Sequence, residues 1–222
     1  MFTDRRSAGR LLADRLAPLA NDDRSHTVVL GLPRGGVPVA REVANRLHAP
    51  LDVIVVRKLG APGQPELAMG AVGEDHVRVL NRDVVAQFGV SAEQLEAASE
   101  VEWREVERRA ALYQRGRPRL QLTGRTAIVV DDGIATGATT RAACAVARAY
   151  GAAHVVLAVP VAPRGWEGMF EDVTDQRIAL ETPRHFMAVG VHYEDFRQTS
   201  DDEVIDCLRE RPASRRAIRD EQ

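Results

Sequence analysis

The stretch AIVVDDGIATGATTRAA, from Ala127 to Ala143, decides the fold. Four apolar residues run into two adjacent aspartates, and a loop of small residues and threonines follows. A short continuous apolar run is typical of a strand that is buried on both faces. Helical spacing resumes after the loop and predicts a helix that begins near Ala138. Because like charges repel one another, the acidic pair is costly unless something outside the chain uses it.

The same alternation of strand and helix continues on both sides of this stretch. Apolar runs at Thr27–Leu32, Pro50–Val56 and His154–Pro163 predict three more buried strands. A helical pattern between the first two runs gives a strand–helix–strand unit, which implies parallel strands and a right-handed crossover. We therefore expect a doubly wound α/β fold with a mainly parallel, Rossmann-like sheet.

Further elements are expected between and beyond these strands. They are a helix over Thr3–Ala20, a helix through Val39, Val43 and Leu47, a mobile loop and then a short hairpin turning at Gly73–Asp75 within Arg57–Asn81, a long surface helix over Ser91–Gln114, short strands at Gln176–Leu180 and Phe186–Val189, and a closing helix over Asp201–Arg211.

Composition limits the classes of protein and partner. The 222 residues are 45% hydrophobic, which suits one α/β domain of ordinary size. The 30 basic and 32 acidic residues are mixed along the chain, so we expect no nucleic-acid partner. A charged N-terminus and the absence of a long apolar run predict no signal peptide and no membrane span. Cys144 and Cys207 lack metal-ligand spacing and suggest reduced thiols in a cytoplasmic protein.

The loop after the acidic pair has the chemistry of an anion site. Ligands in open α/β sheets bind beyond the carboxyl ends of the strands, where this loop lies. Small residues let backbone amides approach a phosphate at a helix N-terminus, and Thr136, Thr139 and Thr140 add hydroxyl donors. Asp131 and Asp132 suit sugar hydroxyls or a bound cation, so a phosphorylated sugar would satisfy both parts. The alternative is an acidic turn that merely caps the following helix.

Other phosphate motifs fit this chain less well. A P-loop needs a Gly-Lys-Ser/Thr ending, and the loop has no lysine. A dinucleotide fingerprint needs G-x-G-x-x-G after the first strand, and GLPRGG, over Gly31–Gly36, does not match.

AIVVDDGIATGATT resembles the signature of the type I phosphoribosyltransferases, and the supporting order of strands and helices covers about Thr27 to Pro160. The resemblance implies that Asp131 and Asp132 hold the ribose hydroxyls of 5-phosphoribosyl-1-pyrophosphate (PRPP) and reach Mg²⁺ indirectly, through water. The residues that would bind the 5′-phosphate are Ala135, Thr136, Gly137, Ala138, Thr139 and Thr140.

Two further segments occupy positions that this family uses for pyrophosphate. GLPRGG follows the first strand, where Arg34 offers charge-assisted hydrogen bonds and Gly35 and Gly36 allow close backbone approach. Arg57 and Lys58 end the second expected strand, and LGAPGQPELAMG after them resembles the family's flexible lid. The catalytic residues expected from the resemblance are Asp131, Asp132, Arg34 and Lys58.

The resemblance implies a Mg²⁺-dependent enzyme of nucleotide salvage in which a nitrogen nucleophile displaces pyrophosphate from PRPP. It also implies a homodimer and a single domain over 1–222. The core would span about 22–162, a variable hood would form from about 1–20 and 163–200, and a C-terminal helix and tail would occupy 201–222. Aromatic residues that could stack on an acceptor ring in the hood are Trp166, Phe186, Tyr193 and Phe196; ordinary core packing is the alternative.

The acceptor is not identified by these motifs. Family members that use 6-oxopurines carry an aspartate where this chain has Ala135, which argues against hypoxanthine and guanine and leaves any general base to another segment. A PRPP-sensing regulatory protein on the same fold is the main alternative function, although no DNA-binding helix-turn-helix is evident. An aspartyl phosphohydrolase with Asp131 as nucleophile would resemble D-x-D, and residue 133 is glycine.

Overall fold

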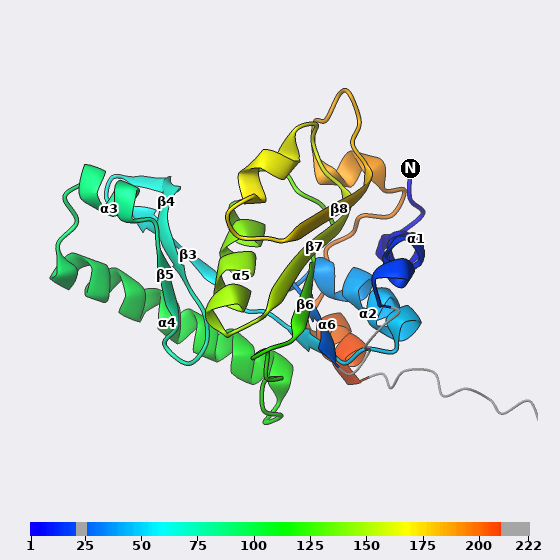
Figure 1. Cartoon of the computed structure of the whole chain (residues 1–222), viewed down its shortest axis with the longest axis horizontal. Coiled ribbons are helices and arrows are strands. Elements are labelled where there is room, and N and C mark those ends of the chain that lie inside the picture. The colour runs from blue at the N-terminus through cyan, green and yellow to red at the C-terminus, as the bar shows by residue number, and fades with distance from the viewer. Residues whose placement is uncertain (21–25, 210–222) are drawn as a thin grey trace, which may run out of the picture.

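A five-stranded parallel sheet forms the centre of the structure (Figure 1). The structure is a computed structural model that describes residues 1–20 and 26–209. The strands lie in the order β2-β1-β6-β7-β8, and all four neighbouring pairs are parallel. Their bounds are β1 Thr27–Gly31, β2 Leu51–Val53, β6 Thr126–Val130, β7 His154–Val161 and β8 Gln176–Glu181. The predicted doubly wound α/β fold is therefore confirmed.

The apolar runs are continuous because the sheet is covered on both faces. In β6, Ile128 and Val130 face one hydrophobic cluster, whereas Ala127 and Val129 face the other. Successive side chains of a strand point to opposite faces, so neither set can be polar.

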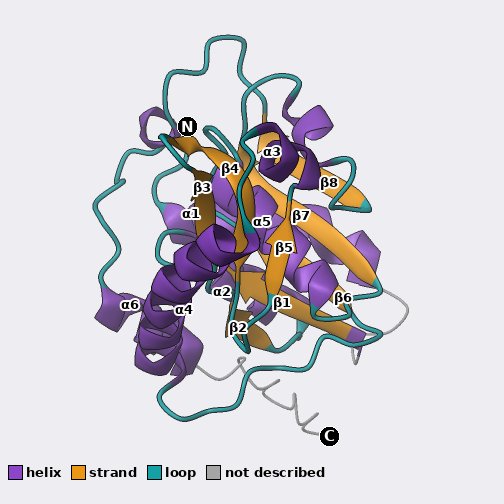
Figure 2. Cartoon of the chain, turned by 90° about the vertical axis from the view of Figure 1, so that its left-hand side faces the viewer, coloured by secondary structure: helices purple, strands orange, loops and turns teal. Residues whose placement is uncertain are grey.

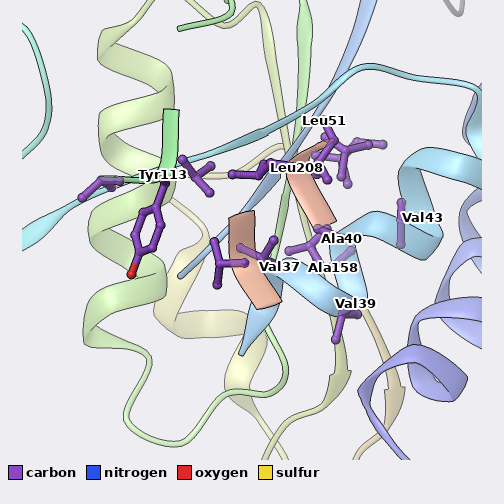
Figure 3. Close-up of a cluster of buried hydrophobic side chains, with 14 of the residues drawn as sticks. Val37, Val39, Ala40, Val43, Leu51, Tyr113, Ala158 and Leu208 are labelled. Atoms are coloured by element: carbon purple, nitrogen blue, oxygen red, sulfur yellow. The ribbon is translucent and has the colours of Figure 1, made fainter. Parts of the chain in front are cut away.

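Helices cover the two faces of this sheet. On one face lie α1 (Arg5–Leu16), α2 (Gly36–Leu47) and α6 (Asp201–Arg209), with a 3₁₀ turn at Ala17–Ala20 after α1. Figure 3 shows Val37 and Ala40 of α2 beside Leu208 of α6 in the cluster that they share. On the other face lies α5 (Ala138–Ala149), which also contacts a second sheet.

The second sheet is the main departure from the expected fold. It is antiparallel, in the order β3-β4-β5, with bounds β3 Arg57–Ala61, β4 Gln64–Val72 and β5 Arg78–Leu80. The prediction of a mobile loop is wrong here, because the residues form the β3–β4 hairpin. Leu59, Ala61 and Met69 are each no more than 3% exposed, and their burial holds the hairpin in place. The second turn, at Gly73–Val77, matches the predicted hairpin.

Two helices connect the second sheet to β6: α3 (Arg82–Gln87), which was not predicted, and α4 (Ala92–Gln114). Ser91 caps α4 as its sequence suggests, by accepting a hydrogen bond from the Gln94 amide. However, α4 is not a plain surface helix. It lies against β3, β4 and α6 (Figure 2). Its buried side chains include Trp103, Val106 and Tyr113.

Other differences are local. The strand expected at Pro50–Val56 is limited to β2, and Phe186–Val189 is not a strand but leads into a 3₁₀ turn at Val189–His192. A further 3₁₀ turn covers Trp166–Phe170. The end of the predicted last helix, beyond Arg209, and the arginine-rich tail lie outside the described residues. Within the described residues, no helix is long and apolar enough to cross a membrane.

Phe170 links the core to the loop before α5, and its removal should destabilise the fold. Its side chain is fully buried and lies edge-on to Trp166, with ring centroids 5.8 Å apart. We expect Phe170→Ala to lower the free energy of unfolding by about 3–5 kcal/mol, because it removes buried apolar area and leaves a cavity. Chemical denaturation measures this loss. Met187→Ala is the control, since Met187 is 87% exposed; equal losses for the two variants would contradict the assignment.

Candidate active site

The order of the parallel strands reverses between β1 and β6, and this switch point places two loops side by side. Gly31 at the end of β1 lies opposite Val130 at the end of β6. The Leu32 amide then donates a hydrogen bond of 2.9 Å to the Val130 carbonyl. The loop before α2 and the acidic pair therefore start from neighbouring points, in the crevice where open α/β sheets bind ligands.

Gly35 and Gly36 let the first loop lie directly against the acidic pair. A Cβ atom on Gly35 would lie 2.0 Å from Oδ2 of Asp132, and one on Gly36 would lie 2.6 Å from the Val130 carbonyl oxygen. Neither position can hold a side chain without movement of the acids. The glycines are thus required by close approach, as the sequence suggested, although what they approach is the chain's own aspartates.

The two aspartates have different surroundings. Oδ2 of Asp132 accepts a hydrogen bond of 2.8 Å from Nε of Arg5, in the first turn of α1. The Asp132 carbonyl accepts another, of 2.6 Å, from the Tyr193 hydroxyl. Burial raises the pKa of the Asp132 carboxyl, and the Arg5 charge opposes this rise. Asp132 is therefore held by segments from both ends of the chain.

Asp131, by contrast, has only neutral hydrogen-bond donors among its described contacts. Its Oδ1 accepts from the Asp132 amide at 2.9 Å and its Oδ2 from the Thr140 hydroxyl at 3.1 Å. Burial, and then the charge of Asp132, raise the pKa of the Asp131 carboxyl from 3.8 to about 8. A bound cation or a set of hydroxyl donors would relieve this cost.

The loop between the acids and α5 is open where the sequence predicts a phosphate. Ala135, Thr136 and Thr139 are exposed, and Gly137 takes a positive φ of 72° immediately before α5. The amides of the first helical turn therefore remain available to an anion. Thr140 departs from the expectation, because it is 3% exposed and its hydroxyl donates to Asp131 rather than facing the loop.

A cavity of about 470 Å³ joins the remaining expected segments. Leu32 and Pro33 line it from the loop after β1, and Thr139 lines it from the first turn of α5. Arg57 and Lys58, at the start of β3, line the same cavity. The structure thus brings together three segments that the sequence assigned separately to phosphate binding.

The positive charge of Arg34 acts on Tyr113 of α4. Burial, followed by the hydrogen bond to Asp201, raises the pKa of the Tyr113 hydroxyl to about 12. The positive charges of Arg109 and Arg34 oppose this rise. Arg34 immediately precedes Gly35 and Gly36, the glycines that contact the acids.

Sequence reasoning missed Arg5, which forms an ion pair with the Asp132 carboxylate. Its guanidinium lies 4.0 Å from the centroid of the Phe196 ring and donates a 2.8 Å hydrogen bond to the Arg197 carbonyl. Arg5 and Arg197 also line a second cavity, of about 280 Å³, between α1, α2 and α6. No local motif marks Arg5, because its partner lies 127 residues further along the chain.

The four aromatic residues expected in the hood divide into two groups. Tyr193 and Phe196 lie beside Asp132 and Arg5. Trp166 is 2% exposed in the core against Phe170, and Phe186 stacks on His192. Phe2, near the N-terminus, forms an isolated parallel bridge with Tyr193.

Proteins of known sequence and solved structures include close relatives of this chain. A protein of Mycobacterium tuberculosis (strain H37Rv) named "Putative phosphoribosyl transferase Rv0571c" is 58% identical over 208 residues. The match covers 94% of this chain and 46% of that protein, so the chain spans about half the length of this relative. The crystal structure of TT1426 from Thermus thermophilus is 44% identical, with a TM-score of 0.86 over 94% of this chain and 97% of that one.

More distant structures share only the fold. The AQ2163 protein from Aquifex aeolicus is 10% identical, with a TM-score of 0.50 over 92% of this chain and 85% of that chain. The model of the phosphoribosyl transferase domain matches residues 5–179, which include both loops and the acidic pair. The chain therefore belongs to the phosphoribosyl transferase domain family.

Proposed function

We propose that this chain is a Mg²⁺-dependent phosphoribosyltransferase that transfers the 5-phosphoribosyl group of PRPP to a nitrogen of a nucleobase or related acceptor and releases pyrophosphate. The observation that carries the proposal is the meeting of three segments at one edge of the sheet. Cations, backbone amides and carboxylates lie at neighbouring positions there. They come from Leu32–Gly36, from Arg57 and Lys58, and from the segment 131–140. PRPP carries matching groups: a diphosphate, a monophosphate and two ribose hydroxyls.

In this proposal each kind of group has one task. The amides of the first turn of α5, with Thr136 and Thr139, bind the 5′-phosphate, and the carboxylates accept hydrogen bonds from the ribose hydroxyls. Negative charge grows on the departing diphosphate as the bond to the anomeric carbon lengthens. Arg34, Arg57 and Lys58 stabilise that charge, since fixed cations in a partly dry crevice act most strongly where charge develops.

Asp131 and Asp132 fit the requirements of Mg²⁺ when it is shared with a substrate. Mg²⁺ usually binds one or two carboxylates together with phosphate oxygens and water. Among the described residues, no group of three or more His, Cys, Asp or Glu side chains could hold a metal without such help. The raised pKa of Asp131 means that its ionised form is destabilised in the free protein, and a nearby cation would stabilise that form. Bound there, Mg²⁺ would neutralise charge on the diphosphate.

Supporting observations for the acceptor side come from Arg5, Tyr193 and Phe196. Arg5 and Tyr193 contact Asp132, and the Phe196 ring packs on Arg5, so the group offers a guanidinium, a phenol and an aromatic ring. Ala135 leaves the loop without the aspartate found in 6-oxopurine enzymes, so we favour other acceptors. A role in nucleotide salvage, a cytoplasmic location and homodimeric assembly remain predictions.

The direct test combines binding with turnover. Calorimetry with PRPP, with and without Mg²⁺, should show binding that depends on the metal. Incubation with PRPP, Mg²⁺ and a panel of bases and small amines should then release pyrophosphate with at least one acceptor. The absence of PRPP binding would exclude the proposal, whereas binding without turnover across the panel would favour the PRPP-sensing alternative.

Gly35→Ala should weaken PRPP binding by about tenfold or more without unfolding the chain. The new methyl group would occupy the position of the Asp132 carboxylate and push it away from the sugar site. Gly168→Ala is the matched control, because nothing lies within 4 Å of a Cβ at that position. Calorimetry measures the affinities of both variants, and equal affinities would show that the close approach at Gly35 has no role in binding.

Asp131→Asn should stabilise the free protein while removing PRPP binding. The pKa of Asp131 is raised from 3.8 to about 8 on folding, so the wild-type carboxyl loses a proton less readily when folded. Its contribution to stability therefore falls as pH rises from the unfolded pKa, near 4, toward the raised folded pKa. Asparagine does not titrate; its Oδ1 can still accept from the Asp132 amide, and its Nδ2 can donate to the Thr140 hydroxyl oxygen in place of the present bond.

The stability advantage of Asp131→Asn should thus grow from pH 5 to pH 8 and level off above it. Denaturation across this range, without ligand, gives the difference directly. If the variant were instead less stable than wild type at pH 8, the aspartate would be serving as a helix cap rather than as a binding group.

A further inference from the structure

The long helix α4 brings two charged residues to the cavity that Arg57 and Lys58 line. Glu102 and Arg109 both face this space of about 470 Å³. They lie seven residues apart, close to two full turns, and so occupy the same side of the helix. The buried residues Trp103, Val106 and Ala110 anchor the adjacent face of α4 in the core, which fixes the position of both charged side chains.

Charge around the cavity favours an anion with several negative charges. Three of the lining residues are cationic, Arg57, Lys58 and Arg109, whereas Glu102 is the acidic one. Arg34 follows the lining residues Leu32 and Pro33 in the chain and adds a further positive charge to this loop. Clefts lined mostly by one sign of charge concentrate ligands of the opposite sign. The diphosphate of PRPP is the part of that molecule with this character.

Each arginine at this cavity is held by a carboxylate of α4. Nε of Arg57 donates to Glu102 at 2.7 Å, and Nε of Arg109 donates to Glu105 at 2.6 Å. Glu105 also accepts two hydrogen bonds from Arg108, at 2.8 and 3.0 Å, so it keeps a partner when Arg109 turns away. The side chains of Arg57 and Arg109 are 39% and 37% exposed, and such exposed ion pairs are weak enough to be exchanged.

We propose that α4 forms part of the pyrophosphate site, in which Arg109 binds the diphosphate beside Arg57 and Lys58, and Glu102 is the counter-ion that Arg57 exchanges for it. This inference rests on the proposed function and extends it to a helix that carries no phosphate motif.

The roles of the two residues are opposite. Arg109 adds a charge-assisted donor to the diphosphate. Glu102 competes for Arg57 and repels the bound anion, so it weakens binding of both PRPP and the pyrophosphate product. Replacement of Glu102 by glutamine should therefore increase affinity, which a merely structural ion pair would not do.

The test is calorimetric titration of the full chain with pyrophosphate and with PRPP, each in the presence of Mg²⁺. Arg109→Gln should weaken pyrophosphate binding by about tenfold, the effect of one charge-assisted hydrogen bond, and Arg109→Lys should lose less. Glu102→Gln should tighten binding severalfold. Arg108→Gln is the matched control, because Arg108 shares Glu105 with Arg109 yet does not line the cavity.

The outcomes separate the two proposals. If wild type binds neither PRPP nor pyrophosphate, the proposed function fails. If wild type binds both and Arg109→Gln matches the Arg108→Gln control, the role of α4 alone is overturned. Weaker binding by Glu102→Gln would overturn the exchange of counter-ions, since Glu102 would then be orienting Arg57 for the ligand. Thermal melting of each variant confirms that changes in affinity come from folded protein, and a gain in affinity cannot come from misfolding.

Discussion

The contact between the Gly35–Gly36 backbone and the acidic pair is the constraint on which the rest of the site depends. It exists because β1 and β6 are neighbours at the switch point of the sheet and end at the same level. A Cβ at either glycine would overlap the end of β6 or the carboxylate beyond it. The position of the two adjacent acids is therefore fixed by strand pairing and not by a flexible loop, although their burial is unfavourable.

Around this contact the site is built from two sides. Segments from both chain ends hold Asp132 through Arg5 and Tyr193. On the other side, α4 and the second sheet present the arginines of the larger cavity. The Tyr113 hydroxyl donates a 2.7 Å hydrogen bond to Asp201, which joins α4 to α6 and so to the helices behind the central sheet. Both sides are consequently anchored to one framework.

Most of the central sheet could be predicted, because its strands are buried on both faces and leave continuous apolar runs. The β3–β4 hairpin could not be predicted, because its glycines and prolines are typical of a loop. Gly60 and Pro65 lie so close that a Cβ on Gly60 would be 2.7 Å from the Pro65 Cα atom, and this closeness needs glycine inside a strand. The buried stripe of α4 was obscured by Ser99, which satisfies its own hydroxyl through the Leu95 carbonyl.

The candidate site was predictable in part for a related reason. Asp131 and Asp132 follow a strand within one short motif, so local sequence reveals them. Arg5 and Glu102 act through partners that are distant in the chain, at separations that no periodicity marks. Thr140 belongs to the motif, yet its position in the first turn of α5 directs its hydroxyl to Asp131.

The alternation of faces in β6 also restricts how the chain can change in length. Val129 and Val130 belong to different hydrophobic clusters, so deletion of one residue from this strand would exchange the clusters and bring an aspartate to a core position. Loss of two residues would preserve the facing but retract the acids from Gly35 by about two strand rises, roughly 7 Å. Variation in length within this family should thus collect in connections away from this edge, such as the one between α3 and α4, where a Cβ on Gly89 would meet nothing within 4 Å.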